Sequence, residues 1–278
     1  MWPLEHRRDV LRVGRDSVEL WRDSTPGLTL QAVANFECAG GPQPADLERC
    51  VAQALREGGA PGGRSARRID VVIESAWLPA MAFDVGAPLS TRGRVESLLR
   101  HRMGELHEPR EPFELRVDYC AGDGHALGYA LAPAVRRAVI AQLVAADRRV
   151  ASVQPAFAWG WARLARHRRR NVAGWWSWSE QDRSIVAHWR AGRVVTLNAG
   201  AVLFDGTADI VRAVDFEAIC RGVLEDLAVV HVDWHRDARS NRADDLDAGS
   251  RLTHVLMAAP TTPADTPALA KAHPTSAA

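Results

Sequence analysis

The chain has 278 residues and a mass of 30.4 kDa, and 47% of its residues are apolar, which is enough for one large domain or two small lobes with a buried core. Its 35 basic and 34 acidic side chains leave a net charge of +1, which removes any global electrostatic case for nucleic acid as a partner. The only lysine is Lys271, so sites that need an ordered lysine amine inside the fold, such as a phosphate-binding loop or a Schiff base, are excluded.

The first half of the sequence predicts a mixed α/β arrangement. Alternating apolar residues and intervening turn residues indicate a meander of three strands, and an amphipathic helix that ends at Gly58 follows it. A continuous apolar strand of the buried, parallel kind comes next. The predicted elements are strands at 10–13, 17–22, 28–37 and 69–74, helices at 44–57 and 88–106, strands at 112–119 and 126–132, a helix from Pro133, and a strand at 149–153.

The second half repeats this order of elements after a fourth helix, predicted at 155–170. That helix carries Phe157, Trp161 and Leu164 in an apolar stripe, so we expect it to bridge two lobes. The repeat is one of element order, because no repeated sequence is visible. Its predicted elements are strands at 172–179, 183–190 and 193–198, a helix at about 207–221, and a strand at 228–232.

The remaining sequence predicts a disordered tail and a cytoplasmic location. Residues 235–278 are poor in bulky apolar side chains and rich in Ala, Pro and Thr toward the end. The first 20 residues lack the apolar core of a secretory signal, and no apolar run approaches the length of a membrane span.

The four cysteines form no C-x-x-C pair, and His231 and His235 are too far apart on a strand to share a metal ion, so no metal site is expected.

Two clusters leave alternatives open. Trp175, Trp176, Trp178 and Trp189 lie on adjacent predicted strands, with Trp176 and Trp178 on one face and Trp175 on the other. They either pack in the core, as tryptophan usually does, or anchor a partner in a groove. The arginines from 163 to 170 either form a solvated helix end or contact anionic lipid or RNA, and lipid contact would make the chain a membrane-surface adaptor.

The predicted order of elements resembles that of the actin-like ATPase superfamily, an α/β fold of two ribonuclease H-like lobes. In both, three strands, a helix and a fourth strand occur twice, on either side of a bridging helix. One region resembles the corresponding part of PilM and GspL, from type IV pilus and type II secretion assembly. It consists of the helix and strands from Leu89 to Tyr119, the elements at 126–132 and from Pro133, and the stretch Val150–Pro155. The resemblance covers roughly residues 10–233 and concerns the order of elements. It implies a first lobe at 1–154 with a small subdomain inserted at about 86–132, and a reduced second lobe at 155–234 that includes the bridging helix.

The chain departs from this family at the positions that contact nucleotide. ATP-binding members carry Asp-x-Gly-x-x-Ser on the first hairpin, where this chain has Arg12 to Ser17 in the order Arg-Val-Gly-Arg-Asp-Ser. The second Asp-x-Gly is replaced by Ser177-Trp178-Ser179, and the Gly-Gly after the last strand by His231-Val232-Asp233-Trp234. The resemblance therefore implies a degenerate member with no catalytic residue, no cofactor and bulky side chains in the nucleotide's place. The vestigial positions are Arg12, Gly14, Ser17, Trp178 and Trp234.

The function that the resemblance implies is a non-catalytic cytoplasmic scaffold at the inner face of the bacterial inner membrane. PilM-like proteins dock on the cytoplasmic N-terminal peptide of PilN, a small bitopic membrane protein, so we expect a partner of that type and no nucleic acid. The alternative is an active actin-like ATPase with unusual phosphate contacts, in which Arg12, Arg15 and Ser17 hold the nucleotide.

Overall fold

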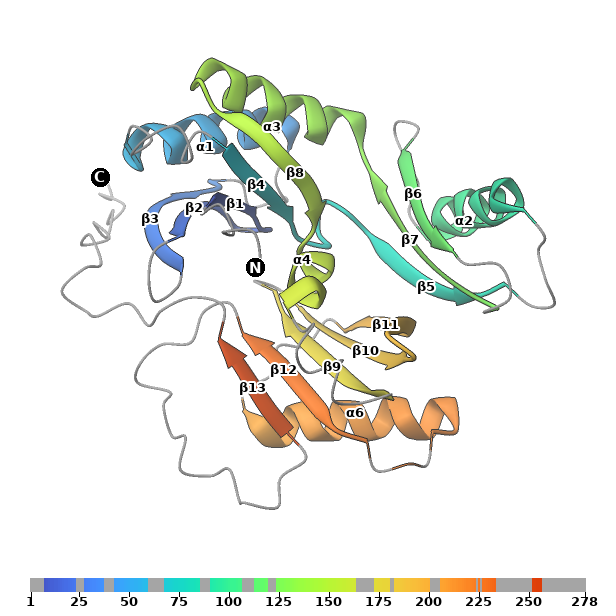
Figure 1. Cartoon of the computed structure of the whole chain (residues 1–278). Coiled ribbons are helices and arrows are strands. Elements are labelled where there is room, and N and C mark those ends of the chain that lie inside the picture. The colour runs from blue at the N-terminus through green and yellow to red at the C-terminus, as the bar shows by residue number, and fades with distance from the viewer. Residues whose placement is uncertain are drawn as a thin grey trace, which may run out of the picture.

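The computed structural model consists of two lobes joined by a short helix, with a small subdomain inserted in the first lobe (Figure 1). It describes residues 8–23, 28–37, 43–59, 68–85, 91–106, 113–119, 124–163, 173–180, 183–200, 206–223, 225, 227–233 and 252–256.

Lobe I is built on a five-stranded sheet in the order β3-β2-β1-β4-β8. The first three strands form the predicted antiparallel meander, and β4 and β8 run parallel to β1, as the continuous apolar sequence of β4 predicts. Helices α1 and α3 pack side by side on the outer face of this sheet (Figure 1). The bounds are β1 Asp9–Val13, β2 Ser17–Asp23, β3 Leu28–Asn35, α1 Pro44–Glu57, β4 Arg68–Ile73, α3 Pro133–Ala145 and β8 Arg149–Pro155.

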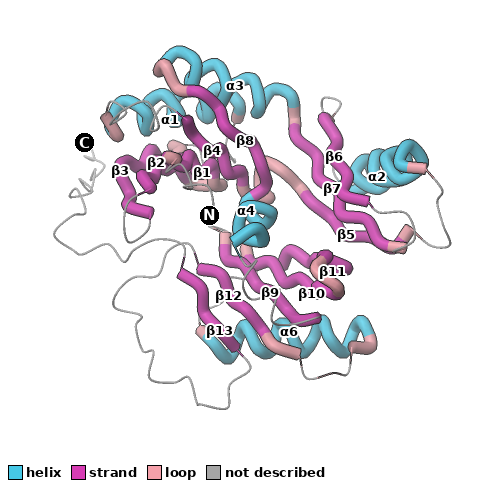
Figure 2. Tube along the Cα trace, viewed as in Figure 1, coloured by secondary structure: helices cyan, strands magenta, loops and turns pink. Residues whose placement is uncertain are grey.

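The inserted subdomain is a three-stranded antiparallel sheet in the order β5-β7-β6, with α2 packed on one face (Figure 2). Its first strand, Ala80–Asp84, was not predicted, so the subdomain begins about six residues before the expected boundary at 86. The sequence does not indicate this strand, because alanine stands at alternate positions, Pro79 adjoins it, and both residue types are depleted in strands. The elements are β5 Ala80–Asp84, α2 Arg92–Leu106, β6 Glu114–Tyr119 and β7 His125–Leu131.

Lobe II repeats the topology of lobe I, with a five-stranded sheet in the order β11-β10-β9-β12-β13. The meander is again antiparallel, and β12 and β13 again run parallel to the first strand of the lobe. Lobe II is reduced in its helices, since α6 alone among the described helices covers its outer face (Figure 1). The bounds are β9 Ala173–Ser179, β10 Ser184–Arg190, β11 Arg193–Gly200, α6 Thr207–Arg221, β12 Val229–Asp233 and β13 Leu252–Leu256.

Strand β13 corrects the predicted tail. The sequence predicts disorder from residue 235, yet Leu252–Leu256 pairs with β12 as the last strand of the lobe II sheet, so lobe II extends to residue 256 rather than 234. Leu252 is buried against α6 in the outer core of the lobe. A five-residue strand between long polar segments is too short for periodicity to reveal, and pairing with β12 decides its structure.

An apolar core fills the space between the lobes. It combines Val10, Trp21 and Val72 of the lobe I sheet with Trp176 and Trp178 of the lobe II sheet. Helix α4, Ala156–Arg163, lies between the two sheets and adds Phe157 and Trp159 to the same cluster. The prediction of a bridging helix is confirmed for this segment, while residues 164–170 of the predicted helix lie outside the described residues.

Candidate inter-lobe site

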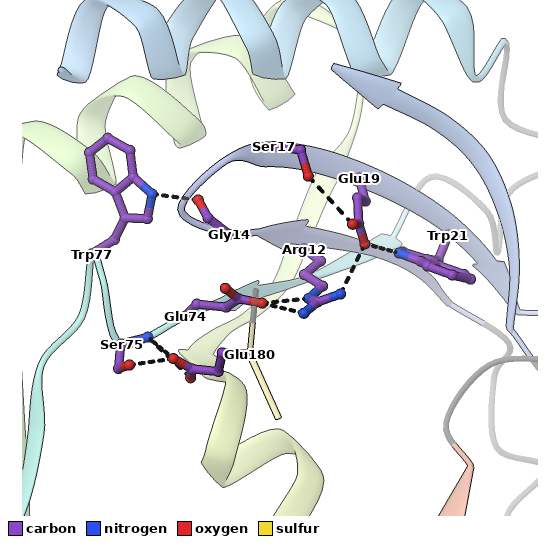
Figure 3. Close-up of polar contacts among 9 residues, drawn as sticks. All are labelled: Arg12, Gly14, Ser17, Glu19, Trp21, Glu74, Ser75, Trp77 and Glu180. Carbon is purple, nitrogen blue, oxygen red and sulfur yellow. Dashed lines mark hydrogen bonds and ion pairs between the residues drawn. The ribbon is translucent and has the colours of Figure 1, made fainter. Parts of the chain in front are cut away.

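The inward face of the lobe I sheet carries a row of charged side chains at the end that meets lobe II. Because side chains alternate along a strand, Arg12 faces the same way as Val10, toward the inter-lobe core. The antiparallel register of β1 and β2 places Glu19 opposite Arg12, and Glu74 follows the last residue of the parallel strand β4. The β1–β2 hairpin and the end of β4, 62 residues away from Arg12 in the sequence, therefore bring their charges together (Figure 3).

Arg12 is the centre of this cluster. Its Nε donates to Oε1 of Glu74 at 2.7 Å, its Nη2 forms an ion pair with the same oxygen, and its Nη1 lies 3.3 Å from Oε2 of Glu19. Trp21 Nε1 donates to Glu19 Oε2 at 2.9 Å, and Ser17 Oγ lies 3.4 Å from Glu19 Oε1. Arg12 and both carboxylates are buried, so the guanidinium is fully committed to partners within lobe I.

The electrostatics favour a charged Arg12 in spite of its burial. Desolvation alone would lower the pKa of this guanidinium, but the carboxylates of Glu74 and Glu19 outweigh it and raise the pKa above the ordinary value. A buried ion pair of this kind costs desolvation on both sides and is stable only while both partners are present. Arg12 is therefore a structural counter-ion for the two acids.

Lobe II contributes a carboxyl group to the same place. Glu180, which follows β9 in the turn to β10, accepts hydrogen bonds from the backbone nitrogen of Ser75 at 3.0 Å and 3.2 Å, and its Oε2 contacts Ser75 Oγ (Figure 3). Burial, and next the nearby Glu74 carboxylate, raise the pKa of Glu180 to about 8. Glu180 therefore binds a proton more tightly than an ordinary glutamate does, and its contacts with Ser75 link the two lobes.

The first hairpin, which carries the phosphate motif in ATP-binding relatives, is closed on itself. Gly14 donates its backbone N–H to Ser17 O at 2.9 Å, and its carbonyl accepts a hydrogen bond from Trp77 Nε1 at 2.7 Å (Figure 3). Arg15, at the tip of the hairpin, is half-exposed and lies 4.0 Å from Asp16. Of the residues that the alternative ATPase reading requires, Arg12 and Ser17 face Glu19 rather than an open cleft.

The four clustered tryptophans are core residues. Trp175, Trp176, Trp178 and Trp189 each expose 1% or less of their surface, which supports the core-packing interpretation and leaves no aromatic surface of theirs for a partner to contact. The faces are as predicted, with Trp175 under α6 and the other three in the inter-lobe core. Tryptophan is buried here because two sheets and α4 meet at this point and leave a wide space to fill.

Trp178 lies in the core between the lobes. The resemblance to actin-like ATPases predicts a bulky side chain at this position in place of a nucleotide. The ring of Trp178 lies against Gly160 of α4, so closely that a Cβ at this glycine would overlap the ring carbons. The other residue expected there, Trp234, lies outside the described residues, as do Arg166 and the arginines that follow it to residue 170.

The sequence gives little warning of the acids in this site. The vestigial positions Arg12 and Ser17 were singled out, but Glu19, Glu74 and Glu180 were not. The sequence contains two signals: Glu19 lies between the apolar residues Val18 and Leu20 of a predicted strand, and Glu74 directly follows the apolar run 71–73. Their convergence on Arg12 depends on strand order and could not be read from spacing.

Other polar groups in the core have structural roles. His231 Nδ1 lies 2.8 Å from Ser177 Oγ on the neighbouring strand, and both residues are buried. Within the described ranges, no three histidine, cysteine or acidic side chains are grouped as ligands for a metal ion. Among the same residues, none of the helices combines the length and hydrophobicity that a membrane crossing requires.

No family model and no curated protein matches the sequence, but its structure is similar to solved ones. A Bacteroides thetaiotaomicron VPI-5482 protein, described as having an actin-like ATPase fold and unknown function, matches with a TM-score of 0.55, 10% identity and 86% of each chain covered. A structure of the PilM–PilN type IV pilus biogenesis complex matches with a TM-score of 0.53, 13% identity and 80% of each chain covered.

A third match is the cytoplasmic domain of EpsL, an inner membrane component of the type II secretion system of Vibrio cholerae, with a TM-score of 0.46, 12% identity and 82% of each chain covered. The first two matches cover 86% and 80% of this chain, more than either lobe alone. The predicted fold class is confirmed: the chain has the two-lobed actin-like fold, in an arrangement similar to that of PilM.

Proposed function

We propose that this chain is a non-catalytic cytoplasmic scaffold of a type IV pilus or type II secretion-like assembly. The observation that supports the proposal is the inter-lobe site, where Arg12, Glu74 and Glu180 are buried beside the first hairpin, the segment in which the resemblance to actin-like ATPases places a phosphate contact. The fold similarity to PilM supports the choice of assembly, because that protein forms a type IV pilus biogenesis complex with PilN.

The charges of the inter-lobe site disfavour a bound nucleotide, because the site contains carboxylates where a phosphate group would need cations. A phosphate group approaching the buried part of the first hairpin would meet the carboxylates of Glu19 and Glu74, which already share the guanidinium of Arg12. Binding would therefore require breaking the Arg12 ion pairs or burying like charges together, and both cost several kcal/mol, about 3–5 for a broken buried pair. The protein thus keeps the actin-like frame without its ATP chemistry.

The partner that we propose is a small inner-membrane protein of the PilN type, bound through its cytoplasmic N-terminal peptide. An extended peptide can add to a sheet edge or lie in a groove and bind mainly through its backbone, so a scaffold needs no catalytic group. Docking in this way would place the chain at the inner face of the bacterial inner membrane.

Two measurements test the proposal. Calorimetric titration with ATP and Mg²⁺ should give no heat of binding, whereas a micromolar dissociation constant would refute the scaffold without nucleotide and favour the ATPase alternative. A synthetic peptide from the N-terminus of a bitopic protein encoded next to this chain should bind in a fluorescence anisotropy titration, and a scrambled peptide should not. If neither peptide binds and the two full-length proteins fail to co-purify, the pilus or secretion assignment is wrong.

A further inference from the structure

The inter-lobe site holds an unequal number of buried charges. Glu19, Glu74 and Glu180 supply three carboxyl groups, Arg12 supplies one guanidinium, and each of the four residues exposes 4% or less of its surface. An unpaired carboxylate in such a place is costly, so the cluster lowers its free energy by taking up a proton. Among the described residues, the excess of acids over guanidinium groups in this cluster therefore favours protonation of one acid.

The contacts identify which acid carries the proton. Glu19 and Glu74 both form ion pairs with Arg12, which stabilises their ionised forms. Glu180 instead meets Ser75, whose backbone nitrogen donates to it and whose hydroxyl lies against Oε2. The Ser75 hydroxyl is a suitable partner for either form of this acid, since a hydroxyl can donate to a carboxylate or accept from a protonated carboxyl group.

We propose that one proton on Glu180 holds the end of β9 in lobe II against Ser75 of lobe I, and that loss of this proton releases this contact. Released, the ionised carboxylate gains water and moves away from Glu74, which follows β4 in lobe I. The device is a proton-dependent latch between the lobes. It goes beyond the scaffold function and does not depend on the identity of the partner.

The groups that face Glu180 agree with this assignment. From lobe I, the Glu74 carboxylate disfavours ionisation, while Arg12 and the two Ser75 hydrogen bonds favour it. From its own turn, Glu180 donates its backbone N–H to the carbonyl of Arg183 at 2.8 Å, which fixes the position of the side chain. Burial is the largest cause and outweighs the favourable contacts, so the pKa rises to about 8 from an ordinary value of 4.5.

The direction of the pH effect follows from this raised pKa. A group that binds its proton more tightly when latched favours the latched state at low pH, and this advantage is lost as the pH rises through the latched-state pKa. With pKa values of about 8 latched and 4.5 released, the ratio of latched to released protein falls about 90-fold between pH 6 and pH 9. The inter-lobe core packs apolar side chains such as Phe157 and Trp176, whose contacts do not depend on pH, so only the contact of Glu180 with Ser75 is released and the lobes stay together.

Hydrogen exchange of the Ser75 backbone amide measures the latch directly, because this N–H donates to Glu180. After correction for the intrinsic pH dependence of exchange, its protection should fall at least tenfold between pH 6 and pH 9. Glu180→Gln keeps a neutral group of the same shape and should hold the protection constant. Glu48→Gln, on the exposed side of α1, is the matched control and should behave like the unaltered chain.

A second measurement needs no variant. Carbon-13 NMR of the glutamate carboxyl groups in the unaltered chain should show one residue that titrates with a midpoint near 8. The proposal is overturned if no glutamate titrates between pH 7 and pH 9, or if the Ser75 amide of the unaltered chain keeps the same protection across this range. Neither result would bear on the scaffold function, which nucleotide titration and peptide binding test separately.

Discussion

The Arg12 ion pairs give the sharpest test of how the inter-lobe site is built. Replacing Arg12 by Met keeps much of the side-chain volume but leaves Glu74, which is 0% exposed, and Glu19 without their counter-ion. Removing one partner of a buried ion pair costs about 3–5 kcal/mol, because the remaining charge cannot return to water. We expect Arg12→Met to lower the free energy of unfolding at pH 7 by that amount, measured by urea denaturation monitored by circular dichroism.

Arg15→Met is the matched control, because Arg15 is in the same hairpin but half-exposed. Its Nε lies 4.0 Å from Oδ1 of Asp16, which makes a weak, solvent-exposed ion pair. The cost of this variant should be at most about 0.5 kcal/mol. A double-mutant cycle with Glu74→Gln should return a coupling of about 1–3 kcal/mol between positions 12 and 74. If Arg12→Met costs no more than Arg15→Met, the buried cluster does not hold the site together and the reasoning is refuted.

Two further variants test the packing around the site. Gly160→Ala would place a methyl group against the ring of Trp178 and should destabilise the fold by about 1–3 kcal/mol. Its control is Gly104→Ala, in open space on α2, which should stabilise the fold by up to about 1 kcal/mol. Equal effects of the two variants in thermal unfolding would contradict the close contact between Gly160 and Trp178. Trp77→Phe removes the hydrogen bond to the Gly14 carbonyl and should cost about 1–2 kcal/mol, with faster amide exchange in the first hairpin; unchanged exchange there would show that Trp77 does not hold the hairpin.

The order of elements could be predicted because the local signals were strong. Helix α1 begins at Pro44 and ends before Gly58 as the sequence indicates, and α6 has the predicted bounds Thr207–Arg221. Alternation placed Trp175 on one face of its strand and Trp176 on the other. These features depend on neighbours within a few residues, so one sequence contains the information.

The parts that were missed depend on contacts between distant segments. Strand β13 becomes a strand by pairing with β12 across a long intervening segment, and β5 does so by pairing with β7. The acids of the site face one another only because β1, β2 and β4 are neighbours in the sheet, and because the two lobes pack so that Glu180 reaches Ser75. No spacing in the sequence records that arrangement.

The inter-lobe site also changes the meaning of Arg12. In sequence, an arginine in place of the family's acid reads as the loss of a function. In the structure, the same arginine pairs with Glu74 and Glu19, and it offsets part of the cost of burying the acids of the site together. Protein groups therefore close the contact between the lobes at this point: Arg12 pairs with two acids in lobe I, and the third acid, Glu180, links lobe II to Ser75.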